Sequence, residues 1–422
     1  MKIIVSARQL NGAVRAVSSK SDAHRAVICA ALCDGQTMVR LGEFSDDIRA
    51  TVECLSAMGA QITEYPDGFL FSGSCISGND ALLNCRESGS TLRFLLPVAA
   101  ALGGRKAFNG EGRLPSRPLL PLMNELEKHN VAFDNKRLPF VCVGKLNGGA
   151  FTVPGNISSQ FISGLMFALP LTGEESEIRV TDGLQSVGYV NMTLDTLARF
   201  GVNWQRDGDL YRISGDEKYV SPSEYVVEGD WSGAAFYLVA AAISGDITVK
   251  GLNVSSSQAD RVILDILKKF GANIECVGDS VRVSRGAAYP ISVDVSDCPD
   301  LFPILSVLAC RAKGVSRLYN ASRLRLKESD RIRSTADMLR AFGVSVTERE
   351  DSLEIRGNGF IEGGAVNGAG DHRIVMSAAV ASLMCGSHGK GSVMVTDGEV
   401  ISKSYPSFFK DFVACGGEYY AV

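Results

Sequence analysis

The chain has 422 residues, 45% of them hydrophobic and 21% charged, with a formal net charge of -4. This composition is typical of a folded globular protein of two or three domains, at roughly 150 residues per domain. A negative chain is a poor general binder of nucleic acid or anionic membranes, because both need a dominant basic surface. No run of 18 apolar residues occurs and no signal peptide is apparent, so we expect a cytoplasmic protein.

In chain order, residues 2–17 hold an N-terminal strand, and a helix that is apolar on every face follows from Arg25 toward Gly35. A helix without a polar face must be buried inside its domain. A second, amphipathic helix ends at Gly59, and an alternating segment that closes at Gly73 indicates a strand. The predicted unit is therefore strand, buried helix, strand, amphipathic helix and strands.

This order of elements recurs along the whole chain. The second helix of each copy ends with a leucine-like residue, three further residues and then Gly or Asn, at positions Gly59, Asn130, Gly201, Gly271, Gly343 and Gly416. The intervals are 71, 71, 70, 72 and 73 residues. Gly and Asn best tolerate the positive φ of a helix C-cap. A strand-closing glycine keeps the same period, although Arg285 stands in its place in the fourth copy. The sequence thus predicts six copies of one unit.

The copies are expected to form two domains of three units each. A Ser221-Pro222-Ser223 loop follows the third copy. The sixth copy runs out at Val422 without room for its last strand, so we expect the N-terminal strand to complete the second half. The predicted domains are residues 19–227 and residues 1–18 with 228–422. The predicted fold class is α/β, with βαβαββ-like units.

Cysteine and histidine patterns indicate neither a disulfide framework nor a metal site. The eleven cysteines are scattered and never spaced as Cys-x-x-Cys, so we expect reduced, mostly buried side chains. The histidines are His24, His129, His372 and His388, and they form no recognisable ligand pair. We therefore predict no bound metal.

The copies differ most at the starts of their buried helices, which lie at residues 19–25, 87–93, 158–160, 230–232, 299–300 and 371–373. Helix capping alone is enough to explain the presence of a single polar residue such as Ser232 or Asp371 at a helix start. At Ser158-Ser159-Gln160, two hydroxyls and an amide meet free backbone N–H groups and the positive end of a helix dipole. That combination predicts a phosphate site.

The densest charge cluster spans residues 323–333. On a helix, Lys327 and Arg331 would share one face, and so would Glu328 and Arg331. A solvated helix start is the alternative interpretation, but like charges placed together repel unless an anion lies between them. Further cations at helix starts and loops are Lys20, Arg25, Arg117, Arg373 and Lys403. The mixture of Arg and Lys favours a ligand with both carboxylate and phosphate groups.

At these motifs the sequence resembles the enolpyruvyl transferases, in particular those that act on 3-phosphoshikimate, over essentially the whole chain. The motifs are Ser-Lys20-Ser21-x3-Arg25, Ser-Gly89-Ser-Thr-Leu-Arg93, Arg117-Pro118, Ser158-Ser159-Gln160, Ser186-x2-Tyr189, Pro-Asp300, Lys327-Glu328-Ser-Asp-Arg331, Asp371-His372-Arg373 and Ser-Lys403-x-Tyr-Pro. The resemblance implies an inside-out α/β barrel fold of two three-unit domains with the substrates in the interdomain cleft. The repeat count agrees with that fold.

The implied reaction moves the carboxyvinyl group of phosphoenolpyruvate to the 5-hydroxyl of 3-phosphoshikimate and releases phosphate, by addition and elimination. It belongs to the route toward chorismate and the aromatic amino acids. The resemblance implies no cofactor, and the partners expected are the two small-molecule substrates, with no nucleic acid and no membrane. We expect a monomer.

The resemblance also implies the site residues. Those for 3-phosphoshikimate are Lys20, Ser21, Arg25, Ser158, Ser159, Gln160, Ser186, Tyr189, Asp300 and Lys327. Those for phosphoenolpyruvate are Lys20, Gly89, Arg117, Gln160, Arg331, Arg373 and Lys403. The reaction needs a base for the 5-hydroxyl and an acid for the methylene carbon. Asp300 is the expected base and Glu328 the expected proton shuttle. Lys20 is a second candidate for that step, because neighbouring cations favour the ionised form of Glu328.

Three departures from the common family pattern stand out. Residues 87–91 read Glu-Ser-Gly-Ser-Thr in place of Asn-Ala-Gly-Thr-Ala, Val187-Gly188 replaces Lys-Pro, and Arg323 stands where some members have Asn. Because Gly89 has no side chain to crowd the phosphoenolpyruvate site, we expect inhibition by the analogue glyphosate, in competition with phosphoenolpyruvate.

Two alternatives remain open at this point. Sister transferases that modify UDP-N-acetylglucosamine share the fold and the donor, but they typically carry a reactive cysteine in a mobile loop, and residues 112–118 contain none. They also prefer Asn at the position of Ser21. A non-catalytic six-unit ring, such as a DNA clamp, would need basic residues repeated in every unit. Here the basic residues are concentrated in particular copies.

Overall fold

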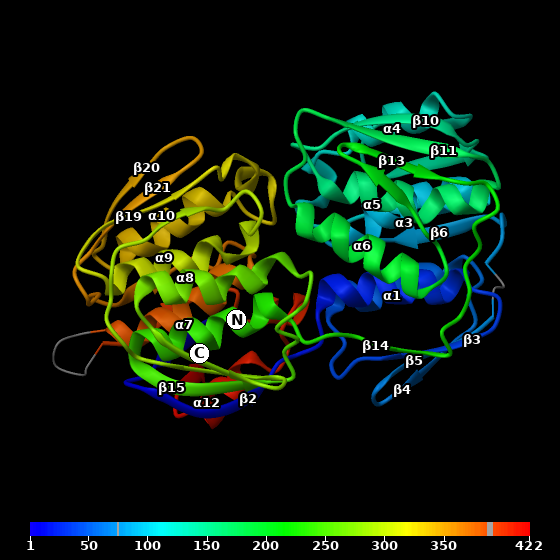
Figure 1. Ribbon diagram of the computed structural model, residues 1–422. Helices are drawn as coiled ribbons and strands as arrows, with labels where there is room; N and C mark the ends of the chain where they lie inside the picture. Colours follow the sequence, from blue (N-terminus) through cyan, green and yellow to red (C-terminus); the bar gives the residue numbers. More distant parts are fainter. Residues whose placement is uncertain (74–75, 386–390) are drawn as a thin grey trace. The chain divides into compact units, whose positions relative to one another are not determined.

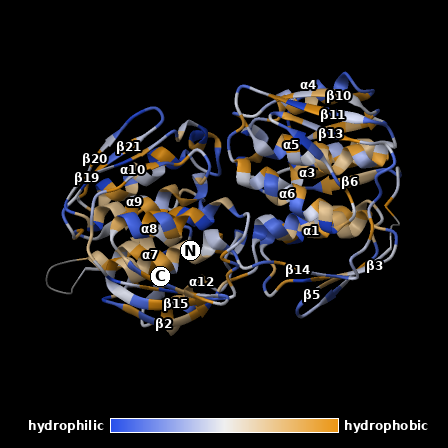
Figure 2. Ribbon diagram, viewed as in Figure 1, coloured by the Kyte–Doolittle hydropathy of each residue, from blue (hydrophilic) through white to orange (hydrophobic). Residues whose placement is uncertain are grey.

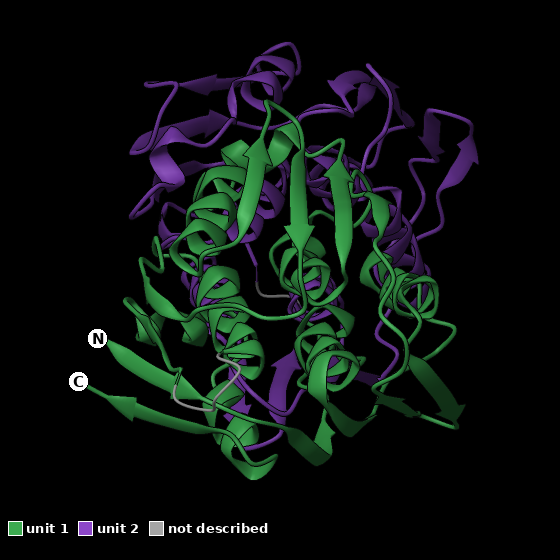
Figure 3. Cartoon of the chain, turned by 90° about the vertical axis from the view of Figure 1, so that its left-hand side faces the viewer, with its two compact units in different colours: residues 1–19, 228–422 green, residues 20–227 purple. Residues whose placement is uncertain are grey.

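The computed structural model describes residues 1–73, 76–385 and 391–422, so Cys75 and His388 lie outside the described residues. The chain divides into two compact units (Figure 3). Unit 1 contains Met1–Ser19 and Glu228–Val422, and unit 2 contains Lys20–Val227. Ser19 falls in unit 1, one residue away from the expected boundary. No helix in the described part of the chain is long and apolar enough to span a membrane.

Unit 2 contains three four-stranded sheets within the described residues. Their strand orders are β14 (Glu224–Val226), β3 (Gln36–Arg40), β5 (Gly68–Ser72), β4 (Ile62–Tyr65); β6 (Ala81–Asn84), β7 (Arg105–Asn109), β9 (Phe140–Gly144), β8 (Val131–Phe133); and β10 (Gly149–Pro154), β11 (Ser176–Thr181), β13 (Leu210–Ile213), β12 (Gln205–Asp207). The helices are α1 (Lys20–Leu32), α2 (Asp46–Ala57), α3 (Gly89–Leu102), α4 (Leu120–Glu127), α5 (Ser159–Ala168) and α6 (Val187–Arg199).

Unit 1 has the same construction over its described residues. Its strand orders are β2 (Leu10–Arg15), β15 (Gly245–Lys250), β17 (Ser280–Ser284), β16 (Asn273–Val277); β18 (Ser292–Asp294), β19 (Gly314–Tyr319), β21 (Leu353–Gly357), β20 (Ser345–Glu348); and β22 (Gly364–Val366), β23 (Val393–Val395), β1 (Ile3–Ser6), β24 (Glu418–Ala421). The helices are α7 (Trp231–Ser244), α8 (Ile263–Phe270), α9 (Phe302–Arg311), α10 (Arg331–Ala341), α11 (His372–Ala381) and α12 (Phe408–Ala414).

Every sheet follows one rule: its first two strands are parallel, and the remaining neighbours are antiparallel. The predicted six-fold repeat and α/β fold class are therefore confirmed. All six Gly and Asn positions have positive φ, as predicted, from 68° at Asn130 to 107° at Gly59, and Gly271 is itself the C-cap of α8.

Buried helices form the core of each unit (Figures 1 and 2). In α7, every residue from Trp231 to Ile243 is buried, as its uniformly apolar sequence predicts. The amphipathic α8 instead buries only one side, with Ile263, Ile266, Leu267 and Phe270. In both units, polar residues lie at or just before the starts of the buried helices, and these residues make up the candidate site.

The first strands of two copies are exchanged between the units. β2 directly precedes α1 in sequence but pairs with β15, and β14 directly precedes α7 but pairs with β3. β1 pairs with both β23 and β24. It fills the place of the strand that the sixth copy lacks.

Candidate active site

In unit 2, Arg25 anchors the first polar cluster. Its buried guanidinium donates a 2.9 Å hydrogen bond to the Thr193 hydroxyl and further bonds to the backbone carbonyls of Ser21 and Tyr189. Burial lowers the pKa of Arg25 to about 10, although Asp22 partly offsets this effect. The side chain therefore stays charged at neutral pH, and neutral acceptors fix its direction. A charged guanidinium held in this way can bind a carboxylate.

The starts of α3 and α5 are joined through Gln160. Its amide nitrogen donates to Ser90 Oγ at 2.7 Å, and its amide oxygen accepts from Arg93 Nη1 at 3.0 Å. Ser158 caps α5 by accepting from the Gln160 backbone N–H at 3.3 Å, and Ser159 is buried beside it. The helix start thus combines fixed hydroxyl and amide groups with a positive dipole end.

Gly89, the first residue of α3, leaves space for two cations. A Cβ atom at this position would lie 2.6 Å from Arg93 Nη1 and 2.7 Å from Arg117 Nη1. Two guanidinium groups therefore close against the N-terminus of α3 because Gly89 has no side chain. Lys20, at the start of α1, forms a 2.8 Å ion pair with Asp47.

Ser186 and Tyr189 lie at the start of α6. Ser186 is buried and has φ 60° and ψ 45°, a left-handed conformation that is uncommon outside glycine. Such conformations cost energy and cluster at functional sites. The Tyr189 carbonyl accepts from Arg25 at 2.7 Å. The structure thus connects the predicted residues of α1 and α6 within one unit.

In unit 1, Arg331 is the centre of the second cluster. Its side chain is only 1% exposed and contacts carboxylates on three sides. Nη1 lies 2.7 Å from Asp300 Oδ1, Nη2 lies 2.7 Å from Glu328 Oε2, and Nε lies 2.8 Å from Asp371 Oδ2. A buried charge of this kind persists only when it is paired and hydrogen-bonded.

Asp300, in the short helix η4 (Pro299–Leu301), is shared by several cations. Arg373 Nη2 lies 2.9 Å from Asp300 Oδ2, and Lys327 Nζ lies 3.9 Å from Asp300 Oδ1. Burial by itself would raise the pKa of Asp300, but Arg373, Lys327 and Arg331 outweigh it and hold the pKa below its ordinary value. Asp300 is therefore ionised at neutral pH, and in this arrangement it is a weak base.

The predicted helical arrangement of Lys327, Glu328 and Arg331 is wrong. The helix η5 (Ser322–Leu326) ends before them, and α10 begins only at Arg331, because Asp330 caps it by accepting from the Arg333 N–H at 3.1 Å. Glu328 and Arg331 still meet, since the Arg331 side chain contacts a residue in the turn before its helix. Lys403 ends η7 (Gly398–Lys403), and its Nζ donates to the Gly370 carbonyl at 3.1 Å.

Sequence reasoning missed several partners of the predicted residues. Asp371 was expected only to cap α11, yet it also pairs with Arg331. Asp47 sits in the acidic first turn of α2, an ordinary feature of helices that gave no sign of its pairing with Lys20. In the described part of the chain, no group of three or more His, Cys, Asp or Glu side chains is placed to hold a metal ion.

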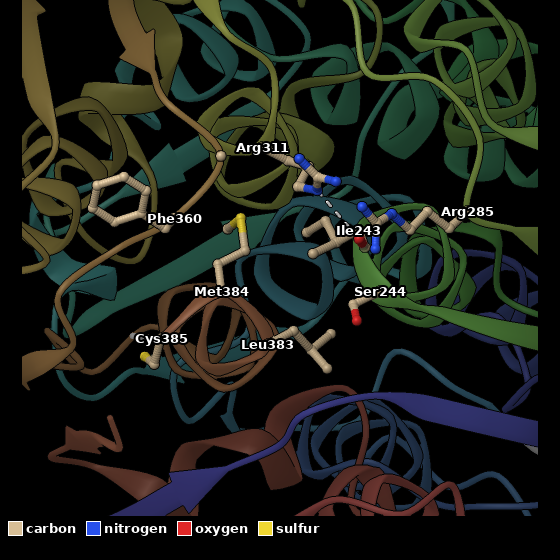
Figure 4. Close-up of a pocket in the computed structure, with 9 residues that line it drawn as sticks. Ile243, Ser244, Arg285, Arg311, Phe360, Leu383, Met384 and Cys385 are labelled. Carbon is tan, nitrogen blue, oxygen red and sulfur yellow. Dashed lines mark hydrogen bonds between the residues drawn. The ribbon is translucent and has the colours of Figure 1, made fainter. Parts of the chain in front are cut away.

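The opposite ends of the unit 1 helices hold a cavity of about 290 Å³ (Figure 4). Ile243 and Ser244 end α7, Arg311 ends α9, and Arg285 follows β17. Arg311 Nε donates to the Ile243 carbonyl at 3.4 Å. Cations are stabilised at helix C-termini, so the position of Arg311 at the end of α9 needs no bound ligand to explain it. We therefore place the candidate site at the helix N-termini and not in this cavity.

The chain is similar to proteins of one known family. Residues 5–412 match the sequence profile of the family described as EPSP synthase (3-phosphoshikimate 1-carboxyvinyltransferase). A 3-phosphoshikimate 1-carboxyvinyltransferase from Clostridium acetobutylicum is 42% identical, covering 97% of this chain and 96% of that protein. Another, from Clostridium novyi, is 40% identical over 99% of this chain and 97% of that protein.

Two solved structures are similar in fold. EPSP synthase from Acinetobacter baumannii aligns over 100% of both chains with a TM-score of 0.81 and 24% identity. The enolpyruvyl transferase NikO from Streptomyces tendae aligns over 99% of this chain and 98% of its own, with a TM-score of 0.77 and 16% identity. Together with the profile match and the full-length relatives, these findings establish that the chain belongs to the EPSP synthase (3-phosphoshikimate 1-carboxyvinyltransferase) family of enzymes.

Proposed function

We propose that the chain transfers the carboxyvinyl group of phosphoenolpyruvate to the 5-hydroxyl of 3-phosphoshikimate, in the shikimate pathway. The oxygen of the 5-hydroxyl bonds to C2 of phosphoenolpyruvate while C3 gains a proton, which gives a tetrahedral intermediate. Phosphate then leaves C2, and C3 loses a proton to restore the vinyl group. One observation carries the proposal: each unit contains a cluster of arginine and other polar side chains suited to bind an anion, and these clusters consist of residues expected from the family motifs.

For 3-phosphoshikimate, the proposal uses mainly unit 2. Ser158, Ser159 and Ser186 would hold the phosphate, and the start of α5 supports this role through its hydroxyl groups and the positive end of the helix dipole. Arg25 and Ser21 would hold the carboxylate. The residues proposed for the ring and for contact with both ligands are Tyr189, Gln160, Asp300 and Lys327.

For phosphoenolpyruvate, Arg331 and Arg373 would grip the carboxylate. Lys20, Arg117 and Lys403 would surround the phosphate, with Gly89 leaving room for it. Support comes from Arg117, which lies against Gly89 at the start of α3, where a dipole also favours an anion. In this assignment residues of both units act on one pair of substrates, and neither unit would suffice alone.

Asp300 is proposed as the base for the 5-hydroxyl and Glu328 as the proton shuttle to C3, with Lys20 as a second candidate. Arg331 and Arg373 both contact Asp300. A substrate carboxylate that engages these arginines would weaken their hold on Asp300 and make it a stronger base when the substrate is in place.

Phosphate release with alternative acceptors tests the proposal. The wild type is incubated with phosphoenolpyruvate and either 3-phosphoshikimate or UDP-N-acetylglucosamine. We expect release only with 3-phosphoshikimate, and loss of it in Lys20→Ala and Asp300→Ala. Release with UDP-N-acetylglucosamine alone would assign the chain to the sister activity instead. Salt-dependent DNA binding without phosphate release would favour the ring-shaped scaffold.

The oligomeric state and location are part of the same proposal. We infer a cytoplasmic monomer that needs no cofactor. Light scattering coupled to gel filtration should give a mass near 45.0 kDa. A mass of twice this value would contradict the monomer.

A further inference from the structure

Asp260 is a buried acid in unit 1 without an assigned role. It lies in the first turn of η3 (Ala259–Val262), and only 3% of the residue is exposed. Within the described residues, its Oδ1 has no hydrogen-bond partner. A buried carboxylate with an unpaired oxygen is costly, so the neutral form is favoured.

The segment before Asp260 fixes its position against the start of α7. The Gln258 amide donates to the Gly229 carbonyl at 2.9 Å and accepts from the Trp231 N–H at 3.1 Å. Gln258 is itself buried, and its backbone N–H donates to Ser256 Oγ at 3.1 Å. Asp260 is therefore held in the interior rather than free to turn toward solvent.

The groups that face Asp260 belong to the candidate active site. Asp300 on η4, Arg373 on α11 and Asp230 at the start of α7 act on it electrostatically, and the Ser232 side chain lies beside it. Burial, followed by repulsion from Asp300, raises the pKa of Asp260 to about 7, against the opposing effect of Arg373. Burial and the neighbouring Asp260 also raise the pKa of the Cys298 thiol, which stays neutral.

The charge balance of the cluster shows why the protonation of Asp260 matters. Among its described members, the cations Lys327, Arg331 and Arg373 face the carboxylates of Asp300, Glu328 and Asp371. Three cations thus face three carboxylates in these contacts, and Asp230 adds a further negative charge near Asp260. Ionisation of Asp260 adds one more negative charge and so disfavours the binding of another anion.

We infer that Asp260 is a positioning residue. While Asp260 is protonated, Arg373 interacts with Asp300 and with the carboxylate of phosphoenolpyruvate. When Asp260 ionises, it competes for Arg373 and weakens the binding of phosphoenolpyruvate. This inference rests on the proposed function. Asp260 itself touches neither substrate in this assignment, so its effect reaches the reaction through Arg373 and Asp300.

The test compares the wild type with Asp260→Asn, which keeps the shape but cannot ionise. KM for phosphoenolpyruvate and kcat are measured between pH 6 and 8. The wild-type KM should rise by about three- to tenfold more than that of the variant over this range, while kcat changes little. The readout is the ratio of the wild-type KM to the variant KM at each pH, because titration of the substrate phosphate affects both KM values equally. Asp265→Asn, at an exposed position on α8, is the matched control and should follow the wild type.

Stability provides a readout that does not depend on activity. The pKa of Asp260 is raised in the folded state, so its contribution to stability is fully present below pH 4 and is lost as pH rises toward 7. Relative to Asp260→Asn, the wild type should lose thermal stability from pH 4 to 7 and then level off. Asp260→Ser offers a second neutral variant if the asparagine variant does not fold.

The outcomes separate this inference from the proposed function. An active wild type whose KM profile runs parallel to those of the neutral variants would overturn the positioning role alone. Loss of kcat at every pH in folded Asp260→Asn would also overturn it, since that result means a direct part in the chemistry. A wild type that releases no phosphate from the two substrates would overturn the proposed function and this inference with it. If the KM of Asp260→Asn changes less with pH than the wild-type KM, the result supports the positioning role of Asp260.

Discussion

The two units hold their functional arginines in different ways. Arg25 of unit 2 is oriented by a hydroxyl and two carbonyls, whereas Arg331 of unit 1 is surrounded by carboxylates. Neutral acceptors fix the geometry of Arg25 without cancelling its charge. Under the proposed function, a ligand carboxylate in unit 1 would instead compete with Asp300, and binding there would be coupled to the acid-base state of the cluster. The proposal thus assigns binding to unit 2 and the link between binding and proton transfer to unit 1.

The largest effect should come from Arg331→Met, which would leave the carboxylates of Asp300, Glu328 and Asp371 without their shared cation. We expect a loss of about 3–5 kcal/mol in the free energy of unfolding, measured with urea. Arg333→Met is the control, because its side chain is 74% exposed and should change stability little. A loss below about 1 kcal/mol in Arg331→Met would show that the buried ion pairs do not hold unit 1 together.

Arg25→Met should affect binding more than stability. Loss of charged hydrogen bonds to the 3-phosphoshikimate carboxylate predicts a fall of about 100-fold in kcat/KM for that substrate. Stability should fall by only about 1–3 kcal/mol, because the partners left behind are neutral. Steady-state kinetics and urea unfolding measure both, with the exposed Arg212→Met as control. A greater loss of stability than in Arg331→Met would reverse the contrast between the units.

Gly89→Ala tests the cationic pocket of unit 2. The added methyl group would lie within 2.7 Å of the Arg93 and Arg117 guanidinium groups and push them aside. KM for phosphoenolpyruvate and the inhibition constant of glyphosate should both rise, by about tenfold or more. Gly42→Ala is the matched control, since nothing lies within 4 Å of a Cβ there. Wild-type inhibition that does not compete with phosphoenolpyruvate would refute the assigned pocket.

The smallest effect concerns acid unfolding. The pKa values of Asp300 and Asp371 are held below normal despite burial, by Arg373 and by Arg331 respectively. Their stabilising contribution is present above about pH 4 and is lost as pH falls. Unit 1 should therefore unfold at a pH about 0.5 higher than unit 2.

Two tryptophans allow that comparison, because Trp231 lies in unit 1 and Trp204 in unit 2. In Trp204→Phe the remaining fluorescence reports unit 1, and in Trp231→Phe it reports unit 2. Coincident midpoints, or earlier unfolding of unit 2, would contradict the charge difference between the clusters.

Much of the fold could be predicted from sequence because each unit repeats local requirements. A buried helix needs apolar residues on all faces, and a C-cap with positive φ favours Gly or Asn, as at Gly59 and Asn130. The predicted boundaries place β14 in the first half of the chain, but its pairing with β3 was not predicted. β14 spans only Glu224–Val226, and three residues carry no signal for the sheet that they join.

The site was predicted only in part, for a different reason. Helix starts reveal residues such as Ser158, which caps its own helix by accepting from the Gln160 N–H. Ion pairs between distant segments leave no such spacing, and Asp371 reaches Arg331 from 40 residues away. Asp260 likewise lies in a short turn with no local marker of its burial or of its nearness to Asp300. At residues 327–331, Asp330 caps a helix that spacing alone would start earlier.

The most direct test of the account is ³¹P NMR of the wild type with phosphoenolpyruvate and 3-phosphoshikimate. The account predicts that the phosphoenolpyruvate signal is replaced by inorganic phosphate in equal amount, while the acceptor keeps its own phosphate and shifts only slightly. Arg25→Met and Asp300→Ala, one in each unit, should each suppress the conversion. Loss of the acceptor's phosphate, or unchanged conversion in either variant, would contradict the claim that both clusters serve this one reaction.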